Sequence, residues 1–184
     1  MNYEEKLAIL SDHYQRERRK LVPSQAMEVL IQAFPAVLVA QADGFTDTSE
    51  VQRLSEIVAF LCRRKEIPMN TLDWTAEIRY LSIDADFWRK TFLDTLKAFL
   101  QLHPQLYNQQ AEFMYAVAVA STGDVVRNLL MRFHRQDSAT PKEELEVISD
   151  KERAEIERLA EELEFQKVPE ALSYLRSLLA HSHA

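Results

Sequence analysis

The sequence predicts an all-α fold, a compact bundle of seven to nine helices. Apolar residues recur at helical spacing in most segments, and no stretch of useful length alternates between apolar and polar residues as a half-buried strand does. The 184 residues include only two glycines, which disfavours a β-rich fold with many tight turns. The hydrophobic fraction of 47% and the charged fraction of 28% are typical of a globular protein with a proper core.

The length of the chain suits one domain. We therefore expect a single domain over residues 1–184, with its core at about 24–166. A helix at 4–20 and a helix at 169–182 would be additions at the two ends of this core.

The first expected helix, 4–20, ends in a basic cluster, and Pro23 should stop it. Its apolar stripe comprises Leu7, Leu10, Tyr14 and Leu21. Its basic cluster comprises Arg16, Arg18, Arg19 and Lys20. The carboxyl end of a helix favours cations, and no interleaved aromatic residues or second basic patch accompany the cluster. It therefore indicates helix-end charge rather than a nucleic-acid site.

Capping residues and prolines predict the remaining helices. Ser24 should cap a second helix, in which Pro35 should produce a kink or a break. Asp84 should cap a fifth helix that reaches about residue 102 and buries Phe87 and Trp88. The other expected elements are helices at 48–65, 71–81, 105–121 and 124–135, a loop at 136–142, a helix after Ser149 and a last helix from Pro169.

We expect the rest of the bundle to be built around the stretch from 27 to 61. Residues 37–40 are apolar on every side, which is typical of a helix buried all round. Gly44 suits the left-handed conformation that ends a helix. Asp47 lies three residues before Glu50, the spacing of a capping box that starts the next helix.

This stretch resembles the tellurite-resistance TerB-like helical family. The signature of that family is an alanine-rich helix ending in Ala-Asp-Gly, with a glutamate seven residues after the aspartate. The matching residues in this sequence are Ala42, Asp43, Gly44 and Glu50. The resemblance implies a TerB-like helical fold and a role in stress response, because the family is associated with metal or tellurium-oxyanion stress.

The same pattern occurs twice, at 36–61 and at 116–165. In each copy an alanine-rich buried helix ends at a glycine, and a capping box then starts an amphipathic helix; the second copy carries an insertion before its cap. We expect a pseudo-repeat of two helical hairpins whose buried helices pack together. The small residues that permit a close approach are Ala36, Ala40, Ala116, Ala118 and Ala120. Thr122 replaces the aspartate in the second copy, so the second hairpin should be structural.

Asp43, Asp47 and Glu50 are the candidate metal ligands. Asp43 would follow the carboxyl end of a helix, where the potential is already negative. Three acids in one loop therefore favour a hard divalent cation with oxygen ligands. Calcium, magnesium and zinc are the candidate cofactors. A purely structural alternative remains, in which Asp47 and Glu50 form the capping box and Asp43 bonds its own backbone.

No catalytic set emerges from the sequence, and we expect that the protein is not an enzyme. Two glycines exclude Gly-rich phosphate loops. None of the five histidines lies three residues after a glutamate, so the Glu-x-x-His pairs of di-iron bundles are absent. The single cysteine, Cys62, excludes an internal disulfide and should be an apolar core residue.

The net charge of −7 arises in the acidic segment 143–164. Such a segment repels nucleic acid and anionic lipid, so we expect no nucleic-acid partner. It indicates a solvated helix face with pairs such as Lys151–Glu155 and Arg158–Glu162 or, alternatively, a surface for a basic partner.

Neither a secretory signal nor a membrane span is expected, which favours a cytoplasmic location. The predicted function is a TerB-like, stress-associated module that binds a cation at the loop Asp43–Glu50. The alternative is a non-catalytic protein-interaction scaffold, which binds a protein partner or self-associates as a homodimer.

Overall fold

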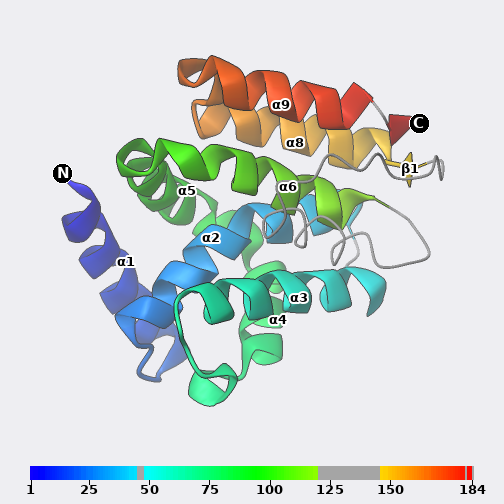
Figure 1. Ribbon diagram of the computed structural model, residues 1–184. Coiled ribbons are helices and arrows are strands. Elements are labelled where there is room, and N and C mark those ends of the chain that lie inside the picture. The colour runs from blue at the N-terminus through cyan, green and yellow to red at the C-terminus, as the bar shows by residue number, and fades with distance from the viewer. Residues whose placement is uncertain (45–47, 120–145, 181, 184) are drawn as a thin grey trace.

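The computed structural model describes residues 1–44, 48–119, 146–180 and 182–183 (Figure 1). These residues form eight α-helices, which confirms the predicted all-α bundle of seven to nine helices. The α-helices are α1 (Tyr3–Arg18), α2 (Ser24–Ala40), α3 (Thr48–Arg64), α4 (Trp74–Ile83), α5 (Ala85–Leu102), α6 (Tyr107–Ala118), α8 (Asp150–Glu162) and α9 (Pro169–Ala180). The short elements are the 3₁₀ helices η1 (Met69–Thr71), η2 (Pro104–Leu106) and η3 (Phe165–Lys167) and the parallel pair β1 (Glu146–Val147) and β2 (Ser182–His183).

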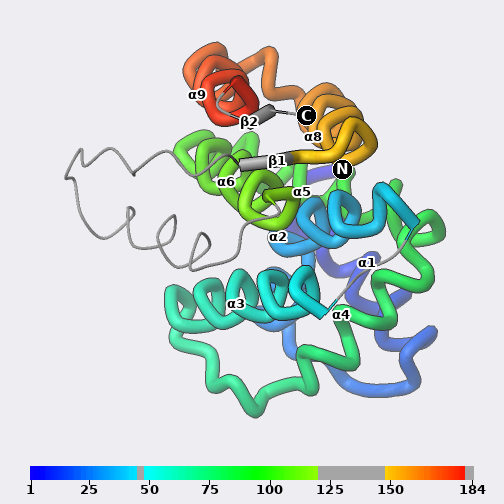
Figure 2. Tube along the Cα trace, turned by 90° about the vertical axis from the view of Figure 1, so that its right-hand side faces the viewer, coloured from blue at the N-terminus to red at the C-terminus, as the bar shows by residue number. Residues whose placement is uncertain are grey.

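Helices α2 and α6 form the centre of the bundle and pack on each other more extensively than any other described pair. In both views α2 lies between α3 and α6, and α8 and α9 lie on the far side of α6 (Figures 1 and 2). Helix α5 contacts α2, and α1 packs on α5. The buried side chains form one continuous cluster through all of these layers.

Helix α2 is buried on every side from Met27 to Ala40, apart from the half-buried Glu28, as its apolar sequence predicts. The sequence predicts a kink or a break at Pro35; the helix is continuous across this residue, so the break does not occur. Ser24 is the first helical residue rather than the cap, and Pro23 stands at the cap position without a side-chain hydrogen bond. A fixed proline φ angle therefore starts the helix in place of the predicted serine cap.

Helix α1 starts with a capping box, in which Asn2 Oδ1 accepts from the Glu5 amide at 2.9 Å and Glu5 Oε2 accepts from the Asn2 amide at 3.0 Å. The chain leaves the helix at Arg19, which adopts the left-handed conformation with φ of 51°. Leu21 is consequently outside the helix and 87% exposed, so its predicted place on the buried stripe is wrong. Val22 is buried instead.

The α4–α5 region differs from the prediction in two places. Helix α4 begins at Trp74 rather than 71, because the Asp73 side chain accepts from the Ala76 amide at 3.1 Å and caps it. Asp84 precedes α5 but makes no capping bond with its side chain. Trp88 is fully buried as predicted, whereas Phe87 is 59% exposed. Phe87 is one position away from the buried face of α5, so it lies at the edge of the core.

The buried helices of the two predicted hairpins, α2 and α6, pack against each other. Val37 and Val117 are buried in α2 and α6, and so are four of the predicted small residues, Ala36, Ala40, Ala116 and Ala118. In the second hairpin, Ser149 Oγ accepts from the Glu152 amide at 3.2 Å and Glu152 Oε2 accepts from the Ser149 amide at 3.0 Å, which confirms the capping box before α8. The predicted helix 124–135, the loop 136–142 and residues Ala120 and Thr122 lie outside the described residues.

The carboxyl-terminal helix ends at Ala180 rather than at 182, and β2 then pairs with β1. Leu175 and Leu179 are buried, and Leu172 and Leu178 are half-buried against the core, as their spacing predicts. None of the helices in the described part of the chain is both long and apolar enough to cross a bilayer.

Candidate functional site

The loop between α2 and α3 has the turn that the sequence predicts. Gly44 adopts a φ of 96°, in the left-handed region, and its amide donates to the Gln41 carbonyl at 2.9 Å. A Cβ atom at this position would meet no other atom within 4 Å, so the backbone angle and not crowding is what favours glycine here. Asp43 follows the carboxyl end of α2 and is exposed.

Glu50 lies in the first turn of α3 and is only 6% exposed. Asp47, the third predicted ligand, lies outside the described residues, and so does its half of the predicted capping box. Among the described residues, no three His, Cys, Asp or Glu side chains gather in a way that could hold a metal ion. The predicted set of Asp43, Asp47 and Glu50 therefore stays a prediction.

A buried carboxylate that the sequence analysis missed lies on α4. Glu77 is fully buried and accepts four bonds, which join α4 to α1 and to the segment after it. Tyr14 Oη donates to Oε2 at 2.5 Å, and Arg18 donates to both oxygens at 2.9 and 3.0 Å. Lys20 Nζ donates to Oε1 at 2.6 Å. The Arg18 guanidinium also lies 4.2 Å from the centre of the Tyr80 ring.

These donors set the ionisation of the cluster. Burial alone would raise the pKa of Glu77, but the bonds from Arg18, Lys20 and Tyr14 outweigh it and lower that pKa to about 2. Burial and the bond to Glu77 raise the pKa of Tyr14, which therefore remains a protonated donor. All four groups have their partners within the cluster, so its geometry indicates a structural link between α1 and α4.

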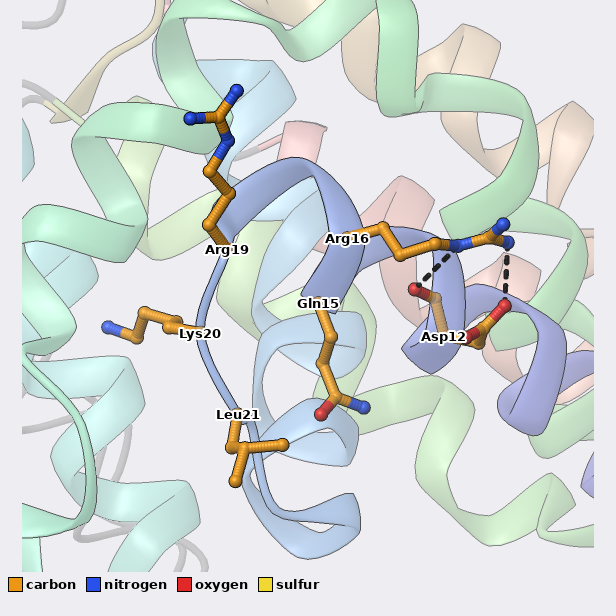
Figure 3. Close-up of a pocket in the computed structure, with 6 residues that line it drawn as sticks. All are labelled: Asp12, Gln15, Arg16, Arg19, Lys20 and Leu21. Atoms are coloured by element: carbon orange, nitrogen blue, oxygen red, sulfur yellow. Dashed lines mark hydrogen bonds and ion pairs between the residues drawn. The ribbon is translucent and has the colours of Figure 1, made fainter.

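The basic end of α1 therefore has a role beyond helix-end charge, because Arg18 and Lys20 neutralise Glu77. An open pocket of about 390 Å³ lies at the same end of α1 (Figure 3). Arg16, Arg19 and Lys20 extend in different directions from its wall, and Arg16 pairs with Asp12 at 2.6 Å (Figure 3). Because these cations do not converge on one point, the pocket is a weak candidate for an anion.

The acidic face of α8 is paired within the bundle. Arg89 of α5 donates to Glu155 at 2.5 Å and to Glu162 at 2.8 Å. The predicted pair of Arg158 with Glu162 is confirmed, with a distance of 3.0 Å. Glu155 pairs with Arg89 and, at 4.0 Å, with Arg158, rather than in the predicted pair with Lys151. In the described part of the segment 143–164 these contacts agree with a helix face laced with ion pairs, although Arg89 and Glu155, each 14% exposed, are largely buried rather than solvated.

Cys62 is buried in α3, and burial raises the pKa of its thiol. A thiol with a raised pKa is a poor nucleophile, which agrees with the predicted core role.

In comparisons with known proteins, no family model, no curated protein and no solved structure matches this chain. The resemblance to the TerB-like family accordingly rests on Ala42, Asp43, Gly44 and Glu50 alone.

Proposed function

We propose that the chain is a stress-associated module of the TerB-like kind that binds a divalent cation between α2 and α3, with Asp43, Asp47 and Glu50 as ligands. The burial of Glu50 carries this proposal. This carboxylate is withdrawn from solvent in the first turn of α3, close in the sequence to Asp43 and Asp47, and it offers an oxygen ligand of the kind that a hard divalent cation prefers. An ionised carboxylate has about four acceptor positions on its two oxygens, so Glu50 can serve both a helix cap and a cation.

The short length of the loop in the sequence agrees with the same proposal. Only residues 45–47 separate Gly44 from Thr48, so the two ends of the loop lie within about 14 Å of each other. Asp43 and Glu50 stand on either side of this short loop, so an ion bound by both would have to lie within its span. Calcium accepts such irregular sets of oxygen ligands, whereas magnesium requires a nearly octahedral set and retains water. Calcium is therefore the first ion to test.

A thermal-unfolding series tests this site. At tenfold excess over its dissociation constant, a cation that binds only the folded state adds about 1.4 kcal/mol of stability. For a chain of this size, that raises the melting temperature by about 3 °C or more. The rise should occur with millimolar calcium and should disappear in Asp43→Asn.

The matched control is Glu157→Gln, which removes one exposed acid from α8, far from the loop in sequence. It should retain the full rise. Unchanged melting in all three proteins with calcium, magnesium and zinc would exclude the cation site, as would an equal rise in Asp43→Asn.

A second candidate function is self-association, favoured by exposed apolar residues near the α1–α5 contact. Ile9 is 57% and Phe87 59% exposed, and the Phe87 ring lies 5.6 Å from the ring of His13, one helical turn after Ile9. Ile83, four residues before Phe87, is 82% exposed. Asp86 and Lys90 are exposed on α5, the helix that contains Phe87. A patch flanked by charges of both signs can pack against the same patch on a second copy of the chain.

Sedimentation of the full chain over a range of concentrations tests this candidate. A concentration-dependent dimer should appear and should be weakened in Phe87→Glu. Leu102→Glu, which places the same charge at an exposed apolar residue at the other end of α5, should leave it intact. A monomer at every concentration would exclude self-association.

A further inference from the structure

A small pocket of about 220 Å³ lies between α2, α3, α5 and the start of α6. It is separate from the loop that precedes α3, because its α3 residues come from the last turn of that helix. Its polar walls are Gln32, Arg64, Lys65 and Gln109, and its apolar walls are Leu61, Phe99 and Leu106. Three stretches distant in the sequence, at 32, 61–65 and 99–109, thus contribute to one concave site.

Gln32 is the unusual member of this set. It lies in the middle of the buried helix α2 and is only 3% exposed, and its amide nitrogen Nε2 has no hydrogen-bond partner among the described residues. A buried N–H donor without an acceptor is destabilising, and most such groups in folded proteins are satisfied. Because Gln32 lines the pocket, a rotation of its amide would bring this donor to an acceptor placed there.

The charge of the pocket indicates which acceptor. Arg64 donates one bond to Gln109 Oε1, and Lys65 pairs with Glu28. A guanidinium has five donors and an ammonium three, so both cations retain donors for another group. With Arg64 and Lys65 against Glu28, the charged residues at this site carry one excess positive charge. A negatively charged acceptor therefore fits better than a neutral one.

The apolar walls restrict the ligand further. Leu61 and Phe99 are buried core residues, and the Lys65 ammonium lies 6.0 Å from the centre of the Phe99 ring. A bare inorganic anion would leave this apolar surface without a partner. We propose that the pocket binds a small carboxylic acid, with the carboxylate at Gln32, Arg64 and Lys65 and a short hydrocarbon chain against Leu61 and Phe99.

Titration of the full chain with sodium hexanoate at constant ionic strength tests the proposal. The probes for comparison are 1-hexanol, which has the chain without the charge, and inorganic phosphate, which has the charge without the chain. The readouts are the melting temperature and the side-chain amide resonance of Gln32 in a ¹H–¹⁵N spectrum. Hexanoate should raise the melting temperature and shift that resonance more than either comparison probe.

Two matched variants assign the effect to Gln32. Gln32→Met keeps the length of the side chain and removes the unsatisfied donor, so it should fold with unchanged or higher stability and lose the response to hexanoate. Gln110→Met makes the same substitution at a fully buried glutamine of α6 whose amide atoms also lack partners among the described residues and which does not line the pocket. It should retain the response. Arg64→Gln should weaken hexanoate binding about tenfold through the loss of a charge-assisted bond.

Water is the competing occupant of the pocket, since it also offers an acceptor to Gln32. If water alone fills the site, hexanoate produces no shift, and the proposal is overturned. An equal response in Gln32→Met overturns it as well. A larger response to phosphate than to hexanoate overturns the carboxylic acid as the ligand class. None of these outcomes depends on the cation site, because Asp43 and Glu50 are unchanged in every variant.

Discussion

Replacement of Glu77 by glutamine is expected to lower the free energy of unfolding by about 3 to 5 kcal/mol at pH 7, the usual cost of removing one partner from a buried ion pair. Glu77 is fully buried, and its two oxygens accept bonds from Tyr14, Arg18 and Lys20. A glutamine offers one acceptor oxygen and no charge, so both cations would lose their counter-ion. Denaturant unfolding measures the loss.

The pH dependence gives a second, independent test of the same carboxylate. The pKa of Glu77 is lowered from 4.5 to about 2 on folding, so between these values the unfolded chain binds the extra proton. The stability from Glu77 is therefore complete above pH 4.5 and is lost as the pH falls toward 2. The shift corresponds to about 3 kcal/mol. Glu77→Gln should lack this part of the acid destabilisation.

Glu157→Gln again serves as the control, because Glu157 is exposed on α8. Its stability at pH 7 should remain within about 0.5 kcal/mol of that of the unsubstituted protein, with the same acid profile. If Glu77→Gln retained the acid profile of the unsubstituted protein, the role assigned to this carboxylate would be wrong.

Phe92→Ala should lower the free energy of unfolding by about 3 to 5 kcal/mol through the loss of a large core side chain. Phe92 of α5 is fully buried, and its ring centre lies 4.6 Å from that of Phe34 in α2 and 6.0 Å from that of Tyr14 in α1. It also lies 5.7 Å from the ring of Trp88. One side chain thus joins three helices, and its removal leaves a cavity that they share.

Leu102→Ala is the control for Phe92→Ala, because it truncates a side chain of the same helix that is 62% exposed. It should change the stability by less than about 0.5 kcal/mol. Thermal unfolding separates the two variants, since about 4 kcal/mol corresponds to roughly 10 °C in a protein of this size. A similar melting temperature for both would contradict the central place of Phe92.

The helices were predictable because local signals define them. The apolar run around Val37 has no polar side on which it could be solvated, so its burial follows from composition alone. Ser149 and Glu152 specify the start of α8 within four residues, without help from the rest of the fold. Such features can be predicted from the sequence because they depend on no residue that is distant in the chain.

The Glu77 cluster was not predicted because its donors are 57 to 63 residues away in the sequence. A signal was nevertheless present, since Glu77 interrupts the helical stripe of Trp74, Ile78 and Leu81 with a charge. Gln32 likewise interrupts the apolar sequence of α2 with a polar side chain. A polar residue on a buried helical face requires either a partner or a ligand, and only the three-dimensional arrangement separates these cases.

The errors at Leu21 and Phe87 have a different origin. Arg19 ends α1 in the left-handed conformation without a glycine or asparagine to announce it, so the apolar period appeared to continue to Leu21. Phe87 adjoins the fully buried Trp88, and aromatic character alone did not show which of the two points inward. The loop acids stay a prediction, because Asp47 is outside the described residues.

Two contacts join the start of α8 to the end of α9. Strands β1 and β2 pair with each other, and the Arg153 guanidinium of α8 donates to the Leu179 carbonyl in the last turn of α9 at 3.1 Å. The 3₁₀ helix η3 connects α8 and α9 at the opposite end of the hairpin. Helix α9 therefore cannot separate from α8 without breaking the β1–β2 backbone pair and the Arg153–Leu179 bond together, so local opening of this hairpin costs both contacts at once.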